Sequence, residues 1–234
     1  MNVGTIVNQE AAIRLINNFF NYTGNVGQSE GNTAVQKAQQ SVTEAMKMSG
    51  QAIAISEMGR QVNELYNELG TGGSQETIEA AREGLRHTMI AMAQNPDNQQ
   101  MLNFVNAARR YGKTEGVEAL QEAFITSNRA QQAGADIRTW WEAFGNLEEP
   151  DMQRRFVEES NAILNAEGTQ TERAEVLNRF SNTVIEIYRE IPEENREETA
   201  KALFTQMNEA RTLEQKNETL TNFGQERLSE QKII

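Results

Sequence analysis

Apolar residues recur along this chain at intervals of three and four, and no stretch alternates apolar and polar residues in the manner of a β-strand. Only three prolines occur in 234 residues, so long stretches of the helical pattern run without a breaker. The pattern predicts an all-α protein. Because the predicted connections are short, neighbouring helices should be antiparallel, as in a helical bundle or stacked hairpins. Residues 102–111 and 177–188 look faintly alike, but without a third copy they support a repeat array only weakly.

Capping residues and glycines divide the pattern into separate helices. Ser74 is a favoured N-cap residue, Pro150 suits a first helical turn, and Thr169 with Glu172 forms a capping-box pair. We therefore expect an elongated antiparallel helical bundle with a long amino-terminal helix and a multi-helix body. The predicted ranges are 6–22, 32–69, 74–94, 97–112, 117–131, 136–145, 150–165, 169–190 and 192–223.

The longest predicted helix, residues 32–69, carries a stripe in which alanine and serine replace many of the expected large side chains. The stripe has coiled-coil spacing, which predicts a helix packed lengthwise on a partner. Its phase slips by one residue after Ala52, which implies a local change of supercoil near Ser49 and Gly50. The candidate interaction residues of this seam are Val35, Ala38, Val42, Ala45, Ser49, Ala52, Ile55, Met58, Val62, Leu65 and Leu69.

Small residues along a seam let two helix axes approach closely, so that van der Waals fit holds the contact. Two interpretations are open: the partner is another helix of the same chain, or it is a second copy or another protein. At 1.5 Å per residue the helix would span about 57 Å, more than most of its sequence neighbours could cover. This length favours the second interpretation.

The glycine-rich break at Thr71, Gly72 and Gly73 is the best candidate for a domain boundary. It divides the chain into an amino-terminal helical hairpin, 1–70, and a helical body, 74–234. Charge is distributed unevenly over these parts. Residues 1–70 carry six acidic and four basic side chains (net −2), residues 71–145 nine and seven (−2), and residues 146–234 nineteen and eleven (−8).

The total net charge of −12 opposes a polyanionic partner, so we do not expect nucleic-acid binding. The absence of cysteine excludes disulfides, thiolate metal sites and a cysteine nucleophile. No basic and apolar signal segment follows Met1, and no window approaches the roughly 20 apolar residues of a membrane span. The sequence therefore predicts a protein without a transmembrane segment that is cytoplasmic, or exported without a classical signal peptide.

Two stretches resemble chemical motifs. The segment AARRYGKT, residues 107–114, is one residue short of a phosphate-binding loop, but alanine stands where the first glycine is needed and no strand precedes it. Arg109, Arg110 and Lys113 are better explained as cations near a helix carboxyl end. His87, the only histidine, lacks the further ligands of a metal site, and we expect it to be exposed or half-buried on its helix.

Paired glutamates and paired tryptophans also have ordinary explanations. The consecutive glutamates at 148–149, 158–159, 193–194 and 197–198 diverge around a helix, so we expect helix-end or solvated positions rather than acid–base pairs. Trp140 and Trp141 could anchor a partner. In a chain with 6 % aromatic residues, however, the core is the favoured place for them.

The stretch AIAISEMGRQVNEL, residues 52–65, resembles the helical core region of flagellins, in which an apolar and small-residue run precedes a polar helix. The acidic, alanine- and glycine-containing run that precedes it in flagellins is missing, and the tail LSEQKII does not match a flagellin terminus. The absence of cysteine and the small numbers of proline and tryptophan are shared with filament and type III-exported proteins as a class. The resemblance implies a structural or exported protein at the level of class only.

We expect a non-enzymatic protein with no catalytic, cofactor or metal site, because no convergent set of titratable groups can be identified. The leading hypothesis is a structural or exported assembly subunit that forms homo-oligomers through the 35–69 seam. The alternative is a cytosolic adaptor, chaperone or assembly scaffold that binds a helix of another protein. Either way, the expected partner is a protein.

Overall fold

The computed structural model of the chain describes residues 52–94 and 98–230. Within these ranges all regular secondary structure is α-helical, which confirms the predicted fold class. The predicted helix 6–22, the part of the long helix before residue 52 and the predicted cap Asp97 lie outside the described residues. The helices are α3 (Ala52–Glu68), α4 (Gln75–Gln94), α5 (Asn98–Glu115), α6 (Val117–Ala133), α7 (Ile137–Asn146), α8 (Pro150–Asn165), α9 (Gln170–Glu190), α10 (Glu193–Glu209) and α11 (Leu213–Glu230).

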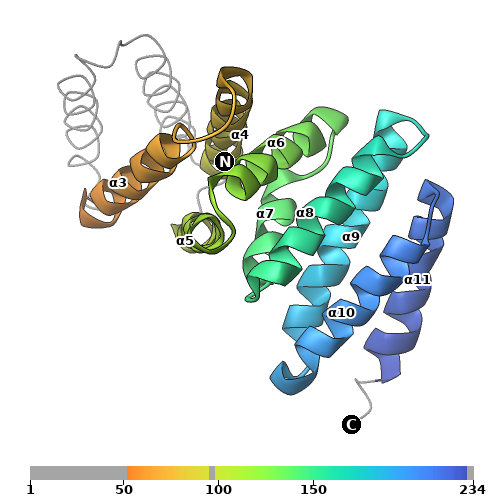
Figure 1. Cartoon of the computed structure of the whole chain (residues 1–234). Helices are drawn as coiled ribbons and strands as arrows, with labels where there is room; N and C mark the ends of the chain where they lie inside the picture. Colours follow the sequence, from red (N-terminus) through yellow and green to blue (C-terminus); the bar gives the residue numbers. More distant parts are fainter. Residues whose placement is uncertain (1–51, 95–97, 231–234) are drawn as a thin grey trace, which may run out of the picture.

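The described helices are stacked in two rows, because each packs against the helix two places further along the chain. One row contains α4, α6, α8 and α10, and the other contains α3, α5, α7, α9 and α11. Figure 1 shows the progression from α3 and α4 at one end to α10 and α11 at the other. This two-layer stack, built from neighbours in sequence, has the architecture of an α-solenoid. The two stretches that look alike, 102–111 and 177–188, lie in α5 and α9 of the same row.

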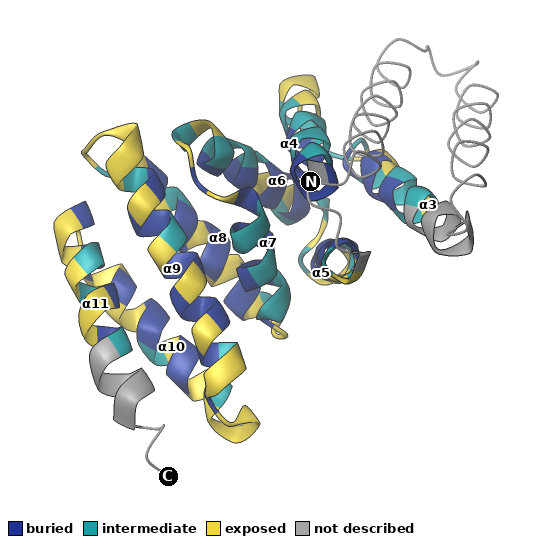
Figure 2. Cartoon of the chain, turned by 180° about the vertical axis from the view of Figure 1, so that it is seen from behind, coloured by how far each residue is buried: buried dark blue, intermediate teal, exposed yellow. Residues whose placement is uncertain are grey.

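An aromatic cluster fills the space between the two rows. Trp140 and Trp141 are 0 % and 1 % exposed, as expected for core residues. Each indole N–H is also satisfied: that of Trp140 donates to Ser160 Oγ over 3.0 Å, and that of Trp141 to Thr88 Oγ1 over 3.1 Å. Ring contacts continue from this pair toward the carboxy-terminal end through Phe156, Phe180 and Phe204. Packing between the rows buries one side of each helix and leaves the other exposed, as Figure 2 shows for α8 to α11.

Helices α4 and α6 approach each other closely at Gly84. A Cβ atom on Gly84 of α4 would lie 2.3 Å from the carbonyl oxygen of Phe124 of α6, which is too close for any side chain. Ala81 and Thr88, one turn before and after Gly84, are fully buried, and so is Ala123 of α6. Small residues therefore do bring two helix backbones together in this protein, at a place that the spacing of the 35–69 seam does not indicate.

Local signals place most helix ends where the sequence predicts them. Ser74 Oγ accepts the backbone N–H of Thr77 over 3.2 Å at the start of α4, and Pro150 occupies the first turn of α8. Thr169 and Glu172 form the predicted capping box at the start of α9. Asp136, the first residue of the predicted range 136–145, caps α7 by accepting from two backbone N–H groups.

Three predicted helix boundaries are wrong, and one of them is the end at residue 223, since α11 continues to Glu230. The helix predicted to end at Gly112 continues to Glu115, because the missing side chain of Gly112 makes room for Leu120 of α6 rather than ending a helix. The helix predicted over 192–223 is two helices, α10 and α11. The break follows from a second capping box: Thr212 Oγ1 accepts the N–H of Gln215, and Gln215 Oε1 accepts the N–H of Thr212, each over 3.2 Å.

Candidate functional site

The predicted seam falls only partly within the described residues. Five of its positions lie outside them: Val35, Ala38, Val42, Ala45 and Ser49. Three more belong to the first turns of α3, where the structure describes the backbone alone: Ala52, Ile55 and Met58. Val62, Leu65 and Leu69 are 6 %, 0 % and 0 % exposed and belong to the core of the stack. At these last three positions the stripe packs within its own chain, and association through the others stays a prediction.

The glycine-rich loop after α3 is held by α6. Gln121 Nε2 donates to the carbonyl oxygens of Leu69 and Gly72, each over 2.7 Å. Arg82 of α4 also donates to Tyr66 O over 3.2 Å and lies over the Tyr66 ring, 4.1 Å from its centroid. These contacts tie the end of α3 to the helices that follow. The division of the chain into domains at 1–70 and 74–234 stays a prediction.

The segment that resembles a phosphate-binding loop is helical throughout, since residues 107–114 lie within α5. Arg109 Nη2 pairs with Glu64 Oε2 of α3 over 2.7 Å, and Arg110 donates to the carbonyl oxygen of Leu147 over 3.4 Å. Of the three cations assigned to a helix end, only Lys113 lies in the last turn. Both arginines connect neighbouring helices instead.

His87 is half-buried on α4, as expected. Its Nδ1 lies 2.7 Å from Asn128 Oδ1 of α6, and its Nε2 lies 3.0 Å from Glu83 Oε1 on its own helix. Arg86 donates to the same Glu83 carboxylate, and this hydrogen bond is the main reason why the pKa of Glu83 is lowered. The cluster is a surface network between α4 and α6.

For one of the consecutive glutamates, the predicted helix-end or solvated position is wrong. Glu159 of α8 is 6 % exposed, and its Oε1 accepts from Lys216 Nζ of α11 over 2.5 Å. Lys216 also donates to the carbonyl oxygen of Met207 over 2.7 Å. Burial raises the pKa of Glu159, and Lys216 opposes this shift. Nothing in the spacing of residues 158–159 distinguishes this carboxylate from its exposed neighbour.

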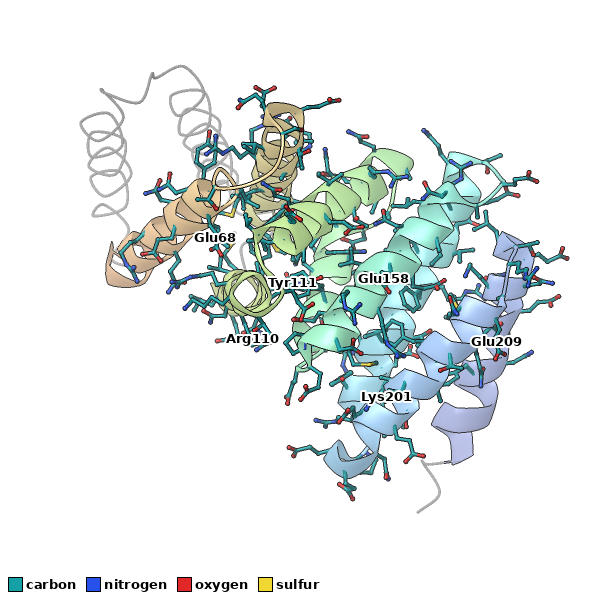
Figure 3. The ribbon with its side chains drawn as sticks, in the orientation of Figure 1. Glu68, Arg110, Tyr111, Glu158, Lys201 and Glu209 are labelled. Atoms are coloured by element: carbon teal, nitrogen blue, oxygen red, sulfur yellow. The ribbon has the colours of Figure 1, made fainter. Side chains whose placement is uncertain are left out.

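The charged side chains of the described residues do not gather into an obvious reaction centre. In Figure 3 the labelled Glu68, Arg110, Glu158 and Lys201 come from different helices and lie apart. In the described ranges, no three histidine, aspartate or glutamate side chains lie close enough together to hold a metal ion. Within the same ranges, none of the helices is both long enough and apolar enough to cross a membrane.

The strongest candidate for a functional site is a hollow of about 580 Å³ beside α6. Its volume falls within the range of about 300–1,000 Å³ that is usual for ligand sites. The loop before α4 and the first turn of α4 border one side, and the last turns of α8 border the other. The lining residues are Gly73, Thr77, Glu118, Gln121, Glu122, Ile125, Thr126, Arg129, Asn161 and Asn165.

A network of neutral and charged side chains forms the α8 side of the hollow. Asn161 is its centre: Oδ1 accepts from Thr126 over 3.1 Å and from Arg129 over 2.9 Å, while Nδ2 donates to Glu122 Oε1 over 3.1 Å. Arg129 donates a second time, to Asn165 Oδ1 over 2.6 Å. The amides thus hold Arg129 in place without neutralising its charge, so the network fixes the α8 wall of the hollow.

Gln121 forms the opposite wall. It is 1 % exposed, and both of the hydrogen bonds that hold the α3–α4 loop come from its Nε2 atom. Its Oε1 atom is buried and accepts no hydrogen bond from any residue that the structure describes. A Cβ atom on Gly73 would lie 3.0 Å from this oxygen, so the oxygen packs against Gly73 and is closed to solvent. Gln121 Oε1 is not singular in this respect, because Gln131 Oε1 of α6 and Gln153 Oε1 of α8 are buried in the same way.

The sequence pattern does not reveal this hollow. Glu118, Glu122 and Arg129 have the spacing of any polar helix face, and the residues opposite them come from α4 and α8, remote in sequence. The buried face of α6 includes the polar residues Gln121, Thr126 and Ser127 among apolar ones, and these are the one available signal. It becomes visible only when the core face of α6 is assigned.

Comparison of the chain with protein-family models, with curated proteins and with solved structures finds no match. What the chain does must therefore be argued from its own fold and surface.

Proposed function

We propose that this chain is a non-enzymatic helical scaffold or adaptor that binds a segment of another protein in the hollow between α4, α6 and α8. The observation that carries the proposal is the wall of this hollow, which presents two exposed carboxylates and an arginine that pairs with amide oxygens and with none of the described carboxylates. Two-layer helical stacks commonly use extended surfaces of this kind for protein binding.

The proposal is tested by crosslinking from inside the hollow. Ile125 is half-buried there, so a photoreactive phenylalanine analogue at this position should crosslink to the partner in an extract of the source organism. The matched control carries the same analogue at Glu175, an exposed position on α9 outside the hollow. We expect a discrete adduct from position 125 alone.

Competition decides whether such an adduct is specific. Excess unlabelled wild-type protein should suppress it, whereas excess Ile125→Trp, whose larger side chain fills the hollow, should not. Identical adducts from both positions, or equal suppression by both competitors, would count against a binding role for the hollow.

Self-association through the 35–69 seam is the second candidate. It is supported by the coiled-coil spacing of the stripe and by the helical backbone of its last part, α3. If the seam assembles copies of the chain, light scattering should show a mass that rises with concentration. Replacing Ala45 and Ala52 together by leucine should then abolish the rise, because the larger side chains force the helices apart. A monomer at all concentrations argues against this candidate.

A further inference from the structure

Helix α11 is held at the end of the stack by a short row of side chains. Within residues 213–224, where the structure describes the side chains of α11, the buried residues are Leu213, Lys216, Leu220 and Phe223. The helix packs on α9 and α10 (Figure 1), and Lys216 extends to Glu159 of α8. The surface of α8, α9 and α10 that α11 covers is called the docking surface below. It accepts a helix with three apolar anchors and one lysine.

Glu159 makes this docking surface selective. Glu159 and Lys216 are the only charged residues that are buried in the described ranges. Besides the ion pair, Lys216 Nζ donates to the carbonyl oxygen of Met207 in the last turn of α10. A docked helix without a cation at this place would leave the Glu159 carboxylate buried and unpaired, which is strongly unfavourable. The docking surface therefore distinguishes a helix with a lysine in this register from one without it.

The connection between α10 and α11 consists of residues that are compatible with a helix. Residues 210–212, Ala-Arg-Thr, include neither proline nor glycine, and the sequence pattern alone predicts one helix over 192–223. The helix is interrupted by the capping box of Thr212 and Gln215, and by a hydrogen bond of 2.9 Å from the Arg211 N–H to Gln215 Oε1. These interactions are local to the connection. They keep the hairpin closed only while α11 stays on its docking surface.

We propose that α11 exchanges between two copies of this chain. The α10–α11 hairpin opens into one continuous helix, and α11 of each copy covers the docking surface of the other, so that each Lys216 pairs with Glu159 of the other copy. The occupant is a second copy because the docking surface already fits α11 at each anchor. Helix contacts are the same in the closed and the exchanged forms, which makes such exchange a low-cost route to a dimer. Burial of Leu220 and Phe223 favours the exchanged dimer over an open monomer.

Two charge-reversed variants of the full chain test the exchange. Lys216→Glu brings two carboxylates together and Glu159→Lys two ammonium groups, so each variant repels its own α11. In an equimolar mixture, each α11 meets the opposite charge only on the other variant. Native mass spectrometry should then show heterodimers in excess over either homodimer by about tenfold or more. Association through any other surface, including the 35–69 seam, would give statistical proportions and would overturn the inference, as would the absence of dimers.

Two controls show whether the preference belongs to the buried pair. Glu197→Lys and Lys201→Glu reverse an exposed ion pair within α10, and their mixture should show no preference for the heterodimer. A single chain that carries both Glu159→Lys and Lys216→Glu regains an internal pair and should behave as the wild-type chain does. A heterodimer preference as large for the α10 pair would contradict the proposed site.

Arg211→Pro tests the continuous helix. Proline cannot continue a helix through position 211. It is compatible with the closed hairpin, because Ala210 already has the extended backbone (φ −76°, ψ 120°) that a following proline requires. Added to both charge-reversed variants, Arg211→Pro should lower the yield of heterodimer at least about tenfold. An unchanged yield would exclude the continuous helix as the route of exchange.

A peptide provides the same test if a charge-reversed chain does not fold. The Lys216→Met chain keeps Glu159 but holds its own α11 less firmly. A fluorescent peptide of residues 211–230 should bind this chain at least about tenfold more tightly than the same peptide with Lys216→Met, as measured by fluorescence anisotropy. Equal affinities, or no binding of either peptide, would show that Glu159 does not select an exchangeable α11.

Discussion

The centre of the stack and its carboxy-terminal pair of helices are held by different contacts. In the centre, Trp141 is surrounded by aromatic rings, with centroids of four of them 4.8 to 5.1 Å away. At the end, α11 is joined to α8 by the buried Lys216–Glu159 ion pair. Aromatic packing stabilises through the apolar area removed from water and tolerates small shifts, whereas a buried ion pair stabilises only while both partners are present.

This difference predicts different responses to mutation. Damage to the centre should lower the stability of the whole stack, since α4 to α9 all contact the aromatic cluster directly or through one neighbour. Damage to the end can be relieved by local opening of α11, because α11 is the last described helix and Phe204 of α10 can keep its contact with Phe180 when α11 opens. The predictions below test this contrast in order of expected size.

The largest effect is expected from Trp141→Ala. The indole is 1 % exposed, so its removal leaves a cavity against Phe104 and Phe124 and should lower the free energy of unfolding by about 3–5 kcal/mol. Urea denaturation followed by circular dichroism measures this loss. Trp141→Phe retains much of the ring area and should cost clearly less. A loss below about 1 kcal/mol for the alanine variant would mean that this packing does not exist in solution.

The second largest effect is expected from Lys216→Met. Removal of the Lys216 ammonium leaves the Glu159 carboxylate buried without a cation, which lowers the free energy of unfolding by about 3–5 kcal/mol in comparable sites. Local opening of α11 exposes Glu159 to water and limits this loss. Hydrogen exchange should therefore accelerate in α11 more than in α7. The double variant Lys216→Met with Glu159→Leu should recover most of the stability, because no charge remains buried.

The same variant should also depend on pH. Burial already raises the pKa of Glu159 above its ordinary 4.5, and removal of Lys216 removes the two effects that oppose the shift. A carboxyl whose folded-state pKa is raised stabilises the fold below the unfolded pKa and loses this contribution as the pH rises through the folded value. The defect of Lys216→Met should therefore be smallest below pH 4.5 and should grow as the pH rises. A defect that grows on acidification would contradict the burial of Glu159.

A smaller loss is expected from Gly84→Ala, at the α4–α6 contact toward the other end of the stack. Alanine favours a helix over glycine by about 1 kcal/mol, so this substitution would stabilise α4 if position 84 faced open solvent. Here the new Cβ atom would meet the Phe124 carbonyl oxygen at 2.3 Å, and overpacking of this kind costs about 1–3 kcal/mol. We therefore expect net destabilisation in thermal unfolding. Gly59→Ala in α3 is the matched control and should stabilise, since nothing lies within 4 Å of its new Cβ atom.

Gly84 also shows what sequence patterns can and cannot reveal here. Helical spacing, caps and the scarcity of proline are local properties, and they predict the fold class and most helix boundaries. The contact that gives Gly84 its role lies on α6, about 40 residues away, so a lone glycine within a helical pattern looks like a weak point. Sequence patterns do not reveal the hollow or the Lys216–Glu159 pair either, because each brings together residues from helices that are not adjacent in sequence. The α10–α11 break, by contrast, has a local signal in Thr212 and Gln215 that the prediction overlooked.

The Thr212–Gln215 capping box allows the smallest-effect test of the difference between the centre of the stack and its carboxy-terminal pair of helices. Thr212→Ala and Thr169→Ala remove the same hydroxyl from the same kind of capping box, at the start of α11 and of α9. Each should cost about 1 kcal/mol in the helix that it caps. Because α9 lies between α7 and α11 in its row, Thr169→Ala should lower the unfolding midpoint of the whole chain, whereas Thr212→Ala should appear as faster hydrogen exchange in α11 with little change in the midpoint. Equal shifts of the midpoint for both variants would show that the stack unfolds as one unit and that its carboxy-terminal pair does not open separately.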